Sequence, residues 1–118
     1  MIQNLTRNTI IASQVTVARH PWARMKGLIG AKALTAGQAL VITRCQSIHM
    51  FGMSFSIDVI FCDRQNKVVG RCVGIKPFRL SPVFFRAHYA IELPTGSIAA
   101  SGTALGDHLS LTQEKGML

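Results

Sequence analysis

The sequence predicts an α+β fold that is mostly β: a compact curled sheet or small barrel of about six or more short strands, with one short N-terminal helix. Two observations predict this class. Short runs rich in β-branched residues recur along the chain, and Gly, Pro, Asn and Asp separate them. Gly70 and Gly74 interrupt one of these runs, and strands that bend at glycine favour the closure of a sheet. The length of 118 residues is typical of one domain, so we expect residues 1–118 to form a single domain.

The first part of the chain is predicted to contain short strands on either side of one helix. Residues 9–18 are rich in β-branched side chains and partly alternate between polar and apolar, which predicts one or two short strands. Pro21 is tolerated in the first turn of a helix, and apolar residues recur after it at helical spacing, so residues 20–29 are predicted to be helical. A turn over residues 34–38 then leads into a short apolar strand at 39–43.

The middle of the chain has the pattern of a β-hairpin followed by a loop. Residues 57–62 and 67–75 are predicted strands, and the Asp-Arg-Gln-Asn sequence at 63–66 suits the turn that joins them. Residues 77–82 begin and end with proline and are irregular and basic, so we expect them to form a surface loop.

The last part of the chain is predicted to contain two strands and one helical turn. Residues 88–93 have strand character and are followed by a proline. Residues 97–101 are expected to form one helical turn that ends at Gly102. A Gly-Asp turn at 106–107 then leads into a last strand at 108–112.

The chain is strongly basic, with thirteen Lys and Arg residues against five Asp and Glu residues, a formal charge of +8 and a pI near 10.3. This excess favours an anionic partner, which would be a nucleic acid, an acidic membrane surface or an acidic protein. The basic residues are spread along the whole sequence, a distribution more typical of a solvated surface than of a binding stripe. Lys76, Arg79 and Arg86 lie among aromatic residues and form the best match to a nucleic-acid-binding surface.

The cysteines and the N-terminus favour an intracellular setting. Cys45, Cys62 and Cys72 form no CxxC pair, and an odd number of cysteines fits reduced thiols better than a disulfide framework. No run approaches the roughly 18 consecutive apolar residues of a membrane helix. The first residues lack the basic start and apolar core of a secretory signal, so the chain as written is expected in the cytoplasm.

Four motifs resemble those of one protein family and occur in the same order. They are an arginine followed by Gly-Leu at 24–28, a Ser-Ile-His-Met run leading to an aspartate-containing strand at 47–63, a strand ending in Leu-Pro-Thr-Gly at 91–96, and the Gly-Asp turn at 106–107. Together they are similar to the family named domain of unknown function 192, also called uncharacterised protein family 0127. The chain departs from its common pattern at Ser56, where many members carry proline.

The resemblance covers roughly residues 12 to 112 and implies a compact β-rich domain. It implies no reaction, because none is established for the family. Many members are exported or attached to a membrane, so the resemblance implies an exported or envelope-associated form as the alternative to a cytoplasmic one.

Asp58 interrupts an otherwise apolar predicted strand, and burying a carboxylate without a partner is costly. Its expected role is structural, because buried carboxylates are usually paired. It would accept hydrogen bonds from backbone N–H groups or from an arginine and so fix the nearby glycine turn. Arg24 is the arginine that we would pair with it, since a guanidinium can bind a carboxylate through two hydrogen bonds. Direct participation in chemistry is the alternative.

His49 lies in the densest motif, four residues after Cys45. A lone imidazole near apolar residues is more often structural than catalytic, and these two residues supply only half of a metal site. His88, His108 and Cys72 would complete such a site only if the fold brings them together. We therefore expect no metal and no cofactor.

Three hypotheses for function follow from these residues. The first is a non-enzymatic binding module for a small molecule, a peptide or a protein, in which thioethers form an adaptable apolar cleft rather than only packing in the core. Its candidate site comprises Arg24, His49, Met50, Met53 and Asp58. The second is a small hydrolase or metal-assisted enzyme that uses His49 and Asp58 with Cys45. The third is a nucleic-acid-binding protein that uses the basic residues Lys76, Arg79 and Arg86.

Overall fold

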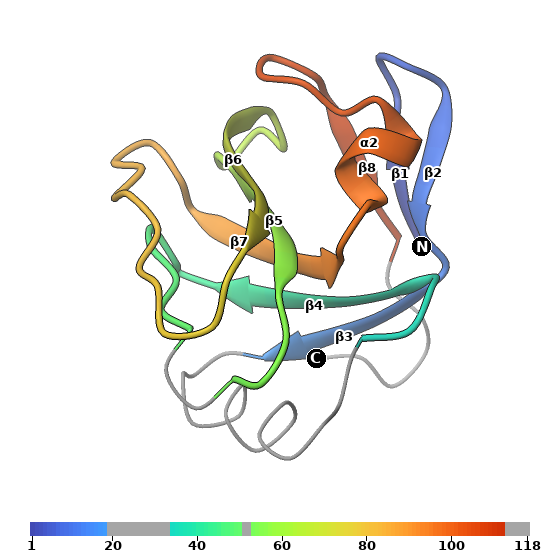
Figure 1. The fold of residues 1–118 in the computed structure, drawn as a ribbon. Coiled ribbons are helices and arrows are strands. Elements are labelled where there is room, and N and C mark those ends of the chain that lie inside the picture. Colours follow the sequence, from blue (N-terminus) through green and yellow to red (C-terminus); the bar gives the residue numbers. More distant parts are fainter. Residues whose placement is uncertain (19–33, 51–52, 113–118) are drawn as a thin grey trace.

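The computed structural model describes residues 1–18, 34–50 and 53–112. These residues form eight strands in two sheets and one short helix, and neither sheet closes into a barrel (Figure 1). The mostly-β prediction is therefore confirmed, in the form of two open sheets rather than a barrel. The helix predicted over 20–29 lies outside the described residues.

The larger sheet has five strands in the order β3-β4-β7-β5-β6. These strands are β3 (Gln14–Ala18), β4 (Gln38–Thr43), β7 (Tyr89–Pro94), β5 (Ile57–Cys62) and β6 (Val68–Ile75). β3 and β4 are parallel, and all other neighbouring pairs are antiparallel. The predicted hairpin is confirmed as β5 and β6, joined through residues 63–67.

Strand β5 is buried along its whole length because the larger sheet has a hydrophobic core on each face. Successive side chains of a strand point to opposite faces of the sheet. Ile60 and Cys62 accordingly belong to one core, and Val59 and Phe61 belong to the other. An almost entirely apolar strand sequence, with Asp58 as its one charged residue, is the expected consequence of this two-sided burial.

The smaller sheet has three strands in the order β2-β1-β8, formed by β2 (Thr9–Ala12), β1 (Ile2–Asn4) and β8 (Leu109–Leu111). The region predicted as one or two strands over 9–18 divides at Ser13 into β2 and β3, which belong to different sheets. Strand β1 was not predicted, because three residues are too short to display an alternating pattern.

Asn4 and Arg7 connect the smaller sheet to the Gly-Asp turn before β8. One carboxylate oxygen of Asp107 accepts hydrogen bonds from the Asn4 amide at 2.9 Å and from the Arg7 guanidinium at 3.0 Å. Burial acts to raise the pKa of Asp107, but the hydrogen bonds from Asn4 and Arg7 outweigh it and hold this pKa below its ordinary value. The turn is therefore stabilised by a carboxylate in its charged form.

The short helix α2 (Ser97–Ser101) lies beside the smaller sheet (Figure 1). It ends at Gly102, which has a left-handed conformation with φ 70 and donates its N–H to the carbonyl of Ile98 at 3.0 Å. This confirms the predicted helical turn and its glycine cap. Ile98 is buried in the core shared by the two sheets.

Candidate functional site

Asp58 lies on β5, and its side chain is fully buried. Its two carboxylate oxygens accept hydrogen bonds from the backbone N–H groups of Gly74 at 2.8 Å and Ile98 at 3.0 Å. Gly74 lies near the end of β6 with φ 62, and Ile98 lies in α2. Asp58 therefore joins three segments that are distant in sequence. It accepts hydrogen bonds from backbone N–H groups, which is one of the two structural roles predicted for it. Arg24 lies outside the described residues, so its pairing with Asp58 stays a prediction.

The Ser-Ile-His-Met motif holds a surface loop in place by backbone pairing. The carbonyl of Ile48 accepts a hydrogen bond from the N–H of Ser81 at 2.8 Å. Met50 donates its N–H to the carbonyl of Arg79 at 2.9 Å and accepts the N–H of Phe78 at 3.0 Å. The motif thus acts as a short strand-like anchor for residues 78–81.

The side chains of the predicted site are mostly directed into the protein. Met50 and Met53 are 0% and 4% exposed and belong to one core of the larger sheet, as the core-packing interpretation predicts. Cys45 is half-buried, and its thiol donates a hydrogen bond to the carbonyl of Ser47 at 3.1 Å. His49 is half-buried. These residues therefore pack against the rest of the protein and expose little surface for a ligand.

Residues 76–86, which we call the basic loop, lie between β6 and β7 and follow one edge of the molecule (Figure 1). Lys76, Arg79 and Arg86, the residues predicted for nucleic-acid binding, are all exposed. The aromatic pair in this loop divides between the core and the surface. The ring of Phe84 packs inward, with its centroid 4.5 Å from that of Phe61, whereas Phe85 is 83% exposed.

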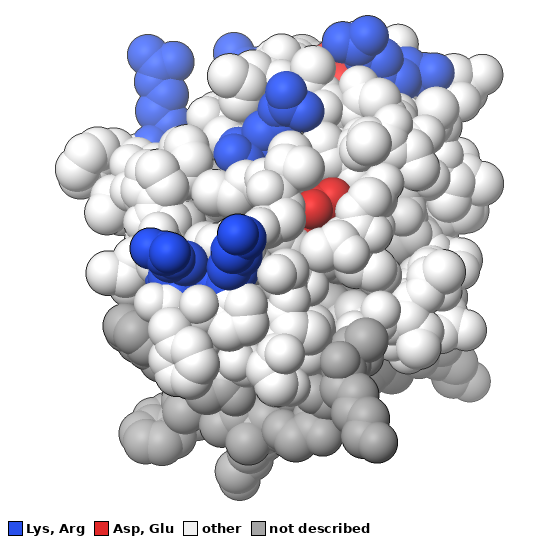
Figure 2. Space-filling view, viewed as in Figure 1, with Lys and Arg blue, Asp and Glu red and all other residues white. Residues whose placement is uncertain are grey.

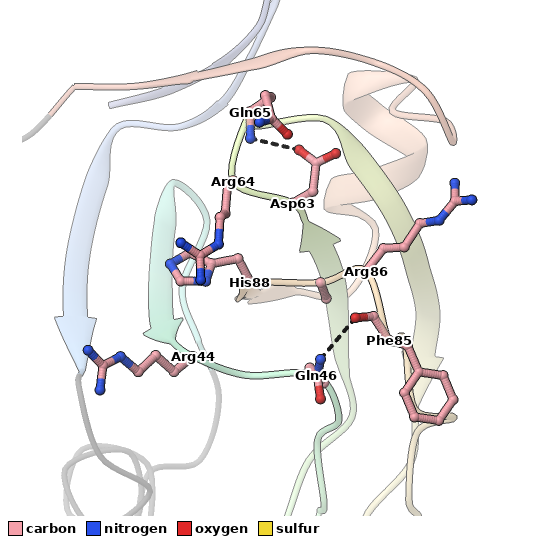
Figure 3. Close-up of a pocket in the computed structure, with 9 residues that line it drawn as sticks. Arg44, Gln46, Asp63, Arg64, Gln65, Phe85, Arg86 and His88 are labelled. Atoms are coloured by element: carbon pink, nitrogen blue, oxygen red, sulfur yellow. Dashed lines mark hydrogen bonds between the residues drawn. The ribbon is translucent and has the colours of Figure 1, made fainter.

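A pocket of about 850 Å³ opens at one edge of the larger sheet, and we call it the arginine pocket (Figure 3). The sheet order explains where it lies. Tyr89 at the start of β7 is paired with Thr43 at the end of β4 and with Cys62 at the end of β5. Residues just beyond these three strand ends therefore meet at the same edge. The lining comprises Arg44, Gln46, Asp63, Arg64, Gln65, Phe85, Arg86, Ala87 and His88.

Hydrogen bonds fix the segments that form this pocket. The backbone N–H of His88 donates to the carbonyl of Cys62 at 2.7 Å, and its carbonyl accepts the N–H of Cys45 at 3.1 Å. The side-chain amide of Gln46 donates to the carbonyl of Phe85 at 2.9 Å (Figure 3). The base of the pocket is therefore preorganised, although the side chains at its rim are exposed.

The arginine pocket carries net positive charge. Arg44, Arg64 and Arg86 are exposed, and none of them forms an ion pair with any residue in the described part of the chain. The one acidic residue of the lining, Asp63, accepts two backbone hydrogen bonds within the hairpin turn, at 2.9 and 3.0 Å. Figure 3 shows Arg64 extending from the hairpin, with Arg44 and Arg86 on opposite sides of the pocket. The head of Arg64 lies beside His88, whereas the heads of Arg44 and Arg86 point outward in Figure 3. The lining thus supplies three exposed arginine side chains that can reach an anion only by changing rotamer.

Sequence reasoning missed most of this pocket, and of its arginines it selected only Arg86. Arg44 and Arg64 each come one or two residues after a predicted strand, and His88 comes at the start of another. Basic residues just beyond strand ends are the signal that was present in the sequence. That signal has meaning only when the strand order is known, because separate sequence positions meet only through the pairing of β4, β7 and β5.

Two thiols outside the hydrolase hypothesis are poorly suited to act as nucleophiles, and the hypothesis that uses His49 and Asp58 with Cys45 stays a prediction. Burial raises the pKa of the Cys62 thiol to about 12, despite a hydrogen bond with Tyr89 that acts to lower it. Burial also raises the pKa of Cys72. Within the residues that the structure describes, no three His, Cys, Asp or Glu side chains are grouped so that they could hold a metal ion. Asp58 is fully buried, and each of its oxygens already accepts a backbone hydrogen bond.

The positive charge is not gathered into one band on the face seen in Figure 2. Lysine and arginine side chains stand there in separate groups, with uncharged surface between them. This distribution favours a local anion site over a long electrostatic track for a nucleic acid. In the described part of the chain, no helix is long and apolar enough to cross a bilayer.

The profile of the family named domain of unknown function 192, described as "Uncharacterized ACR", matches residues 2–111. The chain belongs to this family. The resemblance drawn from the four motifs is therefore confirmed. A protein of uncharacterised protein family 0127 from Thermococcus sibiricus is 31% identical over 98% of this chain and 77% of its own length. A second one, from Pyrococcus horikoshii, is 35% identical over 92% of this chain and 96% of its own length.

Two solved structures share the fold. A protein of unknown function from Novosphingobium aromaticivorans has a TM-score of 0.72 and 19% identity, over 82% of this chain and 74% of that one. A protein from Sinorhizobium meliloti, described as a candidate transcription regulator, has a TM-score of 0.68 and 20% identity, over 81% of this chain and 79% of that one. At these identities the likeness concerns the fold alone.

Proposed function

We propose that this protein is a non-enzymatic binding module whose ligand carries a phosphate group and occupies the arginine pocket. The observation that carries the proposal is that Arg44, Arg64 and Arg86 all line one pocket, with no ion-pair partner for them among the described residues. A guanidinium group presents paired N–H donors that match the spacing of phosphate oxygens. Three such groups around one cavity suit a phosphate-bearing ligand better than a neutral one.

The size and lining of the pocket support a small molecule. Its volume of about 850 Å³ falls within the range of roughly 300–1,000 Å³ that is usual for ligand sites. Gln46 and His88 add further polar groups to the lining. Because the backbone around them is already hydrogen-bonded, binding would order mainly the arginine side chains.

Phe85 favours a second candidate function, the binding of single-stranded nucleic acid. Phe85 belongs to the pocket lining and is 83% exposed, so its ring, which points outward in Figure 3, is accessible for stacking. A nucleotide would combine stacking on Phe85 with phosphate binding, and an oligonucleotide would extend the same contacts towards Lys76 and Arg79.

The residues first predicted for the binding site have a supporting role in this proposal. His49 and Met50 lie on the segment that pairs with the basic loop, Met53 packs beneath it, and Asp58 joins β5 to β6 and α2. Direct contact of these four residues with a ligand stays a prediction. It would appear as a loss of binding in a His49→Ala variant that keeps its urea unfolding midpoint.

The test is isothermal titration calorimetry with three probes: inorganic phosphate, adenosine monophosphate and a short single-stranded oligonucleotide of mixed sequence. We expect Arg44→Gln and Arg64→Gln each to weaken binding by roughly tenfold, the usual effect of losing a charge-assisted hydrogen bond. Arg79→Gln is the matched control, because Arg79 is an exposed arginine outside the pocket lining. It should change the affinity for inorganic phosphate and for adenosine monophosphate by about twofold or less.

Two results would contradict the proposal. One is the absence of binding for all three probes. The other is an equal loss of affinity for adenosine monophosphate in Arg79→Gln and Arg44→Gln. Tighter binding of the oligonucleotide than of the nucleotide, with a steep decrease as salt is added, would establish the nucleic-acid function instead.

A further inference from the structure

We infer that the basic loop docks on a membrane surface that contains anionic lipids. This inference goes beyond the proposed function, because it concerns a different partner and depends mainly on Phe78, Leu80 and Val83, which lie outside the pocket lining. Four large apolar side chains of the loop are exposed: Phe78 (69%), Leu80 (66%), Val83 (51%) and Phe85 (83%). Single exposed apolar residues are common on protein surfaces, but four of them within one short loop mark an interaction site.

The charges around these side chains favour an anionic bilayer. Lys76, Arg79 and Arg86 are exposed on the same loop. Between Asp63 and Glu92 the sequence contains six lysine and arginine residues and no acidic residue. Peripheral membrane sites combine these features, because apolar side chains enter the headgroup region while lysine and arginine contact lipid phosphates.

The aliphatic residues of the loop separate this partner from a nucleic acid. Leu80 and Val83 have no aromatic face on which a base could stack, so a nucleic acid would leave much of their apolar surface in water. A bilayer removes the surface of aliphatic and aromatic side chains from water alike. The composition of the exposed loop therefore fits a membrane better than an oligonucleotide.

The backbone of the loop is held in place before any partner binds. Its backbone is bonded to Ile48 through Ser81 and to Met50 through Phe78 and Arg79. A further hydrogen bond runs from the amide of Gln46 to the carbonyl of Phe85. Docking of this loop would consequently order few additional groups, which favours binding.

The backbone at Phe78 is a second observation that points to an external contact. Residues 76–79 form a turn in which the N–H of Arg79 bonds to the carbonyl of Lys76 at 3.3 Å, with Pro77 at the second position. Phe78, at the third position, has φ 63, a conformation that favours glycine or asparagine in such turns. A strained aromatic residue that is 69% exposed contributes little to the fold, so its presence is better explained by a partner.

The test is sedimentation of the whole protein with vesicles of phosphatidylcholine, with and without phosphatidylglycerol. We expect binding only to the vesicles that contain phosphatidylglycerol, and weaker binding as salt is added. Phe78→Gly and Leu80→Ser should each lower the partition coefficient by roughly tenfold. Phe78→Gly should also raise the urea unfolding midpoint, because glycine adopts a positive φ without strain. A loss of binding in a more stable variant is not caused by unfolding.

Leu105→Ser is the matched control, because Leu105 is 63% exposed on a turn outside the basic loop. It should leave vesicle binding unchanged. The inference is wrong if neither vesicle binds the protein, or if Leu105→Ser loses as much binding as Leu80→Ser. It is also wrong if the protein binds no vesicles but self-associates in analytical ultracentrifugation, and Phe78→Gly abolishes this self-association. The loop would then contact a second copy of this chain.

Arg44→Gln separates this inference from the proposed function, since Arg44 lines the pocket but lies outside the basic loop. It should keep vesicle binding within about twofold while it loses phosphate binding. An equal, tenfold loss of vesicle binding in Arg44→Gln would place membrane contact at the pocket and overturn docking by the loop. If phosphate binding is absent but vesicle binding depends on Phe78 and Leu80, the proposed function is wrong and the membrane inference is still supported.

Discussion

Replacing Asp58 with alanine is expected to destabilise the fold by about 2–6 kcal/mol. The estimate comes from the two backbone N–H groups that Asp58 accepts, those of Gly74 and Ile98. Each would lose a carboxylate acceptor, and an unsatisfied buried donor costs about 1–3 kcal/mol, with the buried N–H of Ile98 towards the upper end and the partly buried N–H of Gly74 towards the lower end. A domain of ordinary stability has only about 5–15 kcal/mol to lose. Asp58→Asn keeps the size and one acceptor oxygen, so about half of this loss is expected.

The assay is urea unfolding followed by far-ultraviolet circular dichroism, together with hydrogen exchange at Gly74 and Ile98. Asp63→Ala provides a matched control, because Asp63 also accepts two backbone N–H bonds but does so in an exposed hairpin turn. Water can replace the acceptor there, so the expected loss is about 0.5–1 kcal/mol. Equal losses for Asp58→Ala and Asp63→Ala, or unchanged exchange at Gly74 and Ile98, would refute the argument from burial.

Three further predictions concern the core and the titrating groups. Gly70→Ala should destabilise the protein by about 1–3 kcal/mol in the same urea assay, because an added Cβ would collide with the ring of Phe84; a change below the error of the assay would contradict this packing. Iodoacetamide should leave Cys62 unmodified in the folded protein and modify it after unfolding, as mass spectrometry of the peptides can establish, because Cys62 is buried and its pKa is raised to about 12. The stabilising contribution of Asp107 should be complete above its ordinary pKa of 3.8 and should be lost as the pH falls through the lower pKa of the folded state. Urea unfolding of the Asp107→Asn variant beside the parent protein should therefore show a stability difference that narrows in acid.

Much of the strand content could be predicted because it depends on local patterns. The apolar runs at 57–62 and 88–93, and the turn residues between 57–62 and 67–75, produce β5, β6 and β7 almost within their predicted bounds. The glycine cap of α2 was predicted for the same reason, since a left-handed cap is a property of one residue. Strand β1 was missed because its three residues are held by pairing with two other strands. β2 follows it after a turn, and β8 lies at the other end of the chain.

The candidate site was predicted less well, and Asp58 and Arg44 show why. An aspartate in an apolar strand predicts that a partner exists, but only the packing of β6 and α2 against β5 supplies Gly74 and Ile98 as that partner. The position of Arg44 just beyond a predicted strand has no meaning until the strand order is known. Arg44 contributes to the arginine pocket only because β4 and β5 both pair with β7, so that their ends lie at one edge.

The sequence by itself determined the β-rich class, the hairpin, the glycine-capped helical turn, the positive charge and the membership of an uncharacterised family. These depend on residue type and spacing over short distances, where backbone propensity and hydrophobic alternation act directly. Only the tertiary structure decided that the methionines of the central motif are buried and that Phe85 rather than Phe84 is exposed. It also decided that Arg44, Arg64 and Arg86 line the same pocket. Those outcomes depend on strand order, and strand order is set by the packing of two cores that no short segment contains.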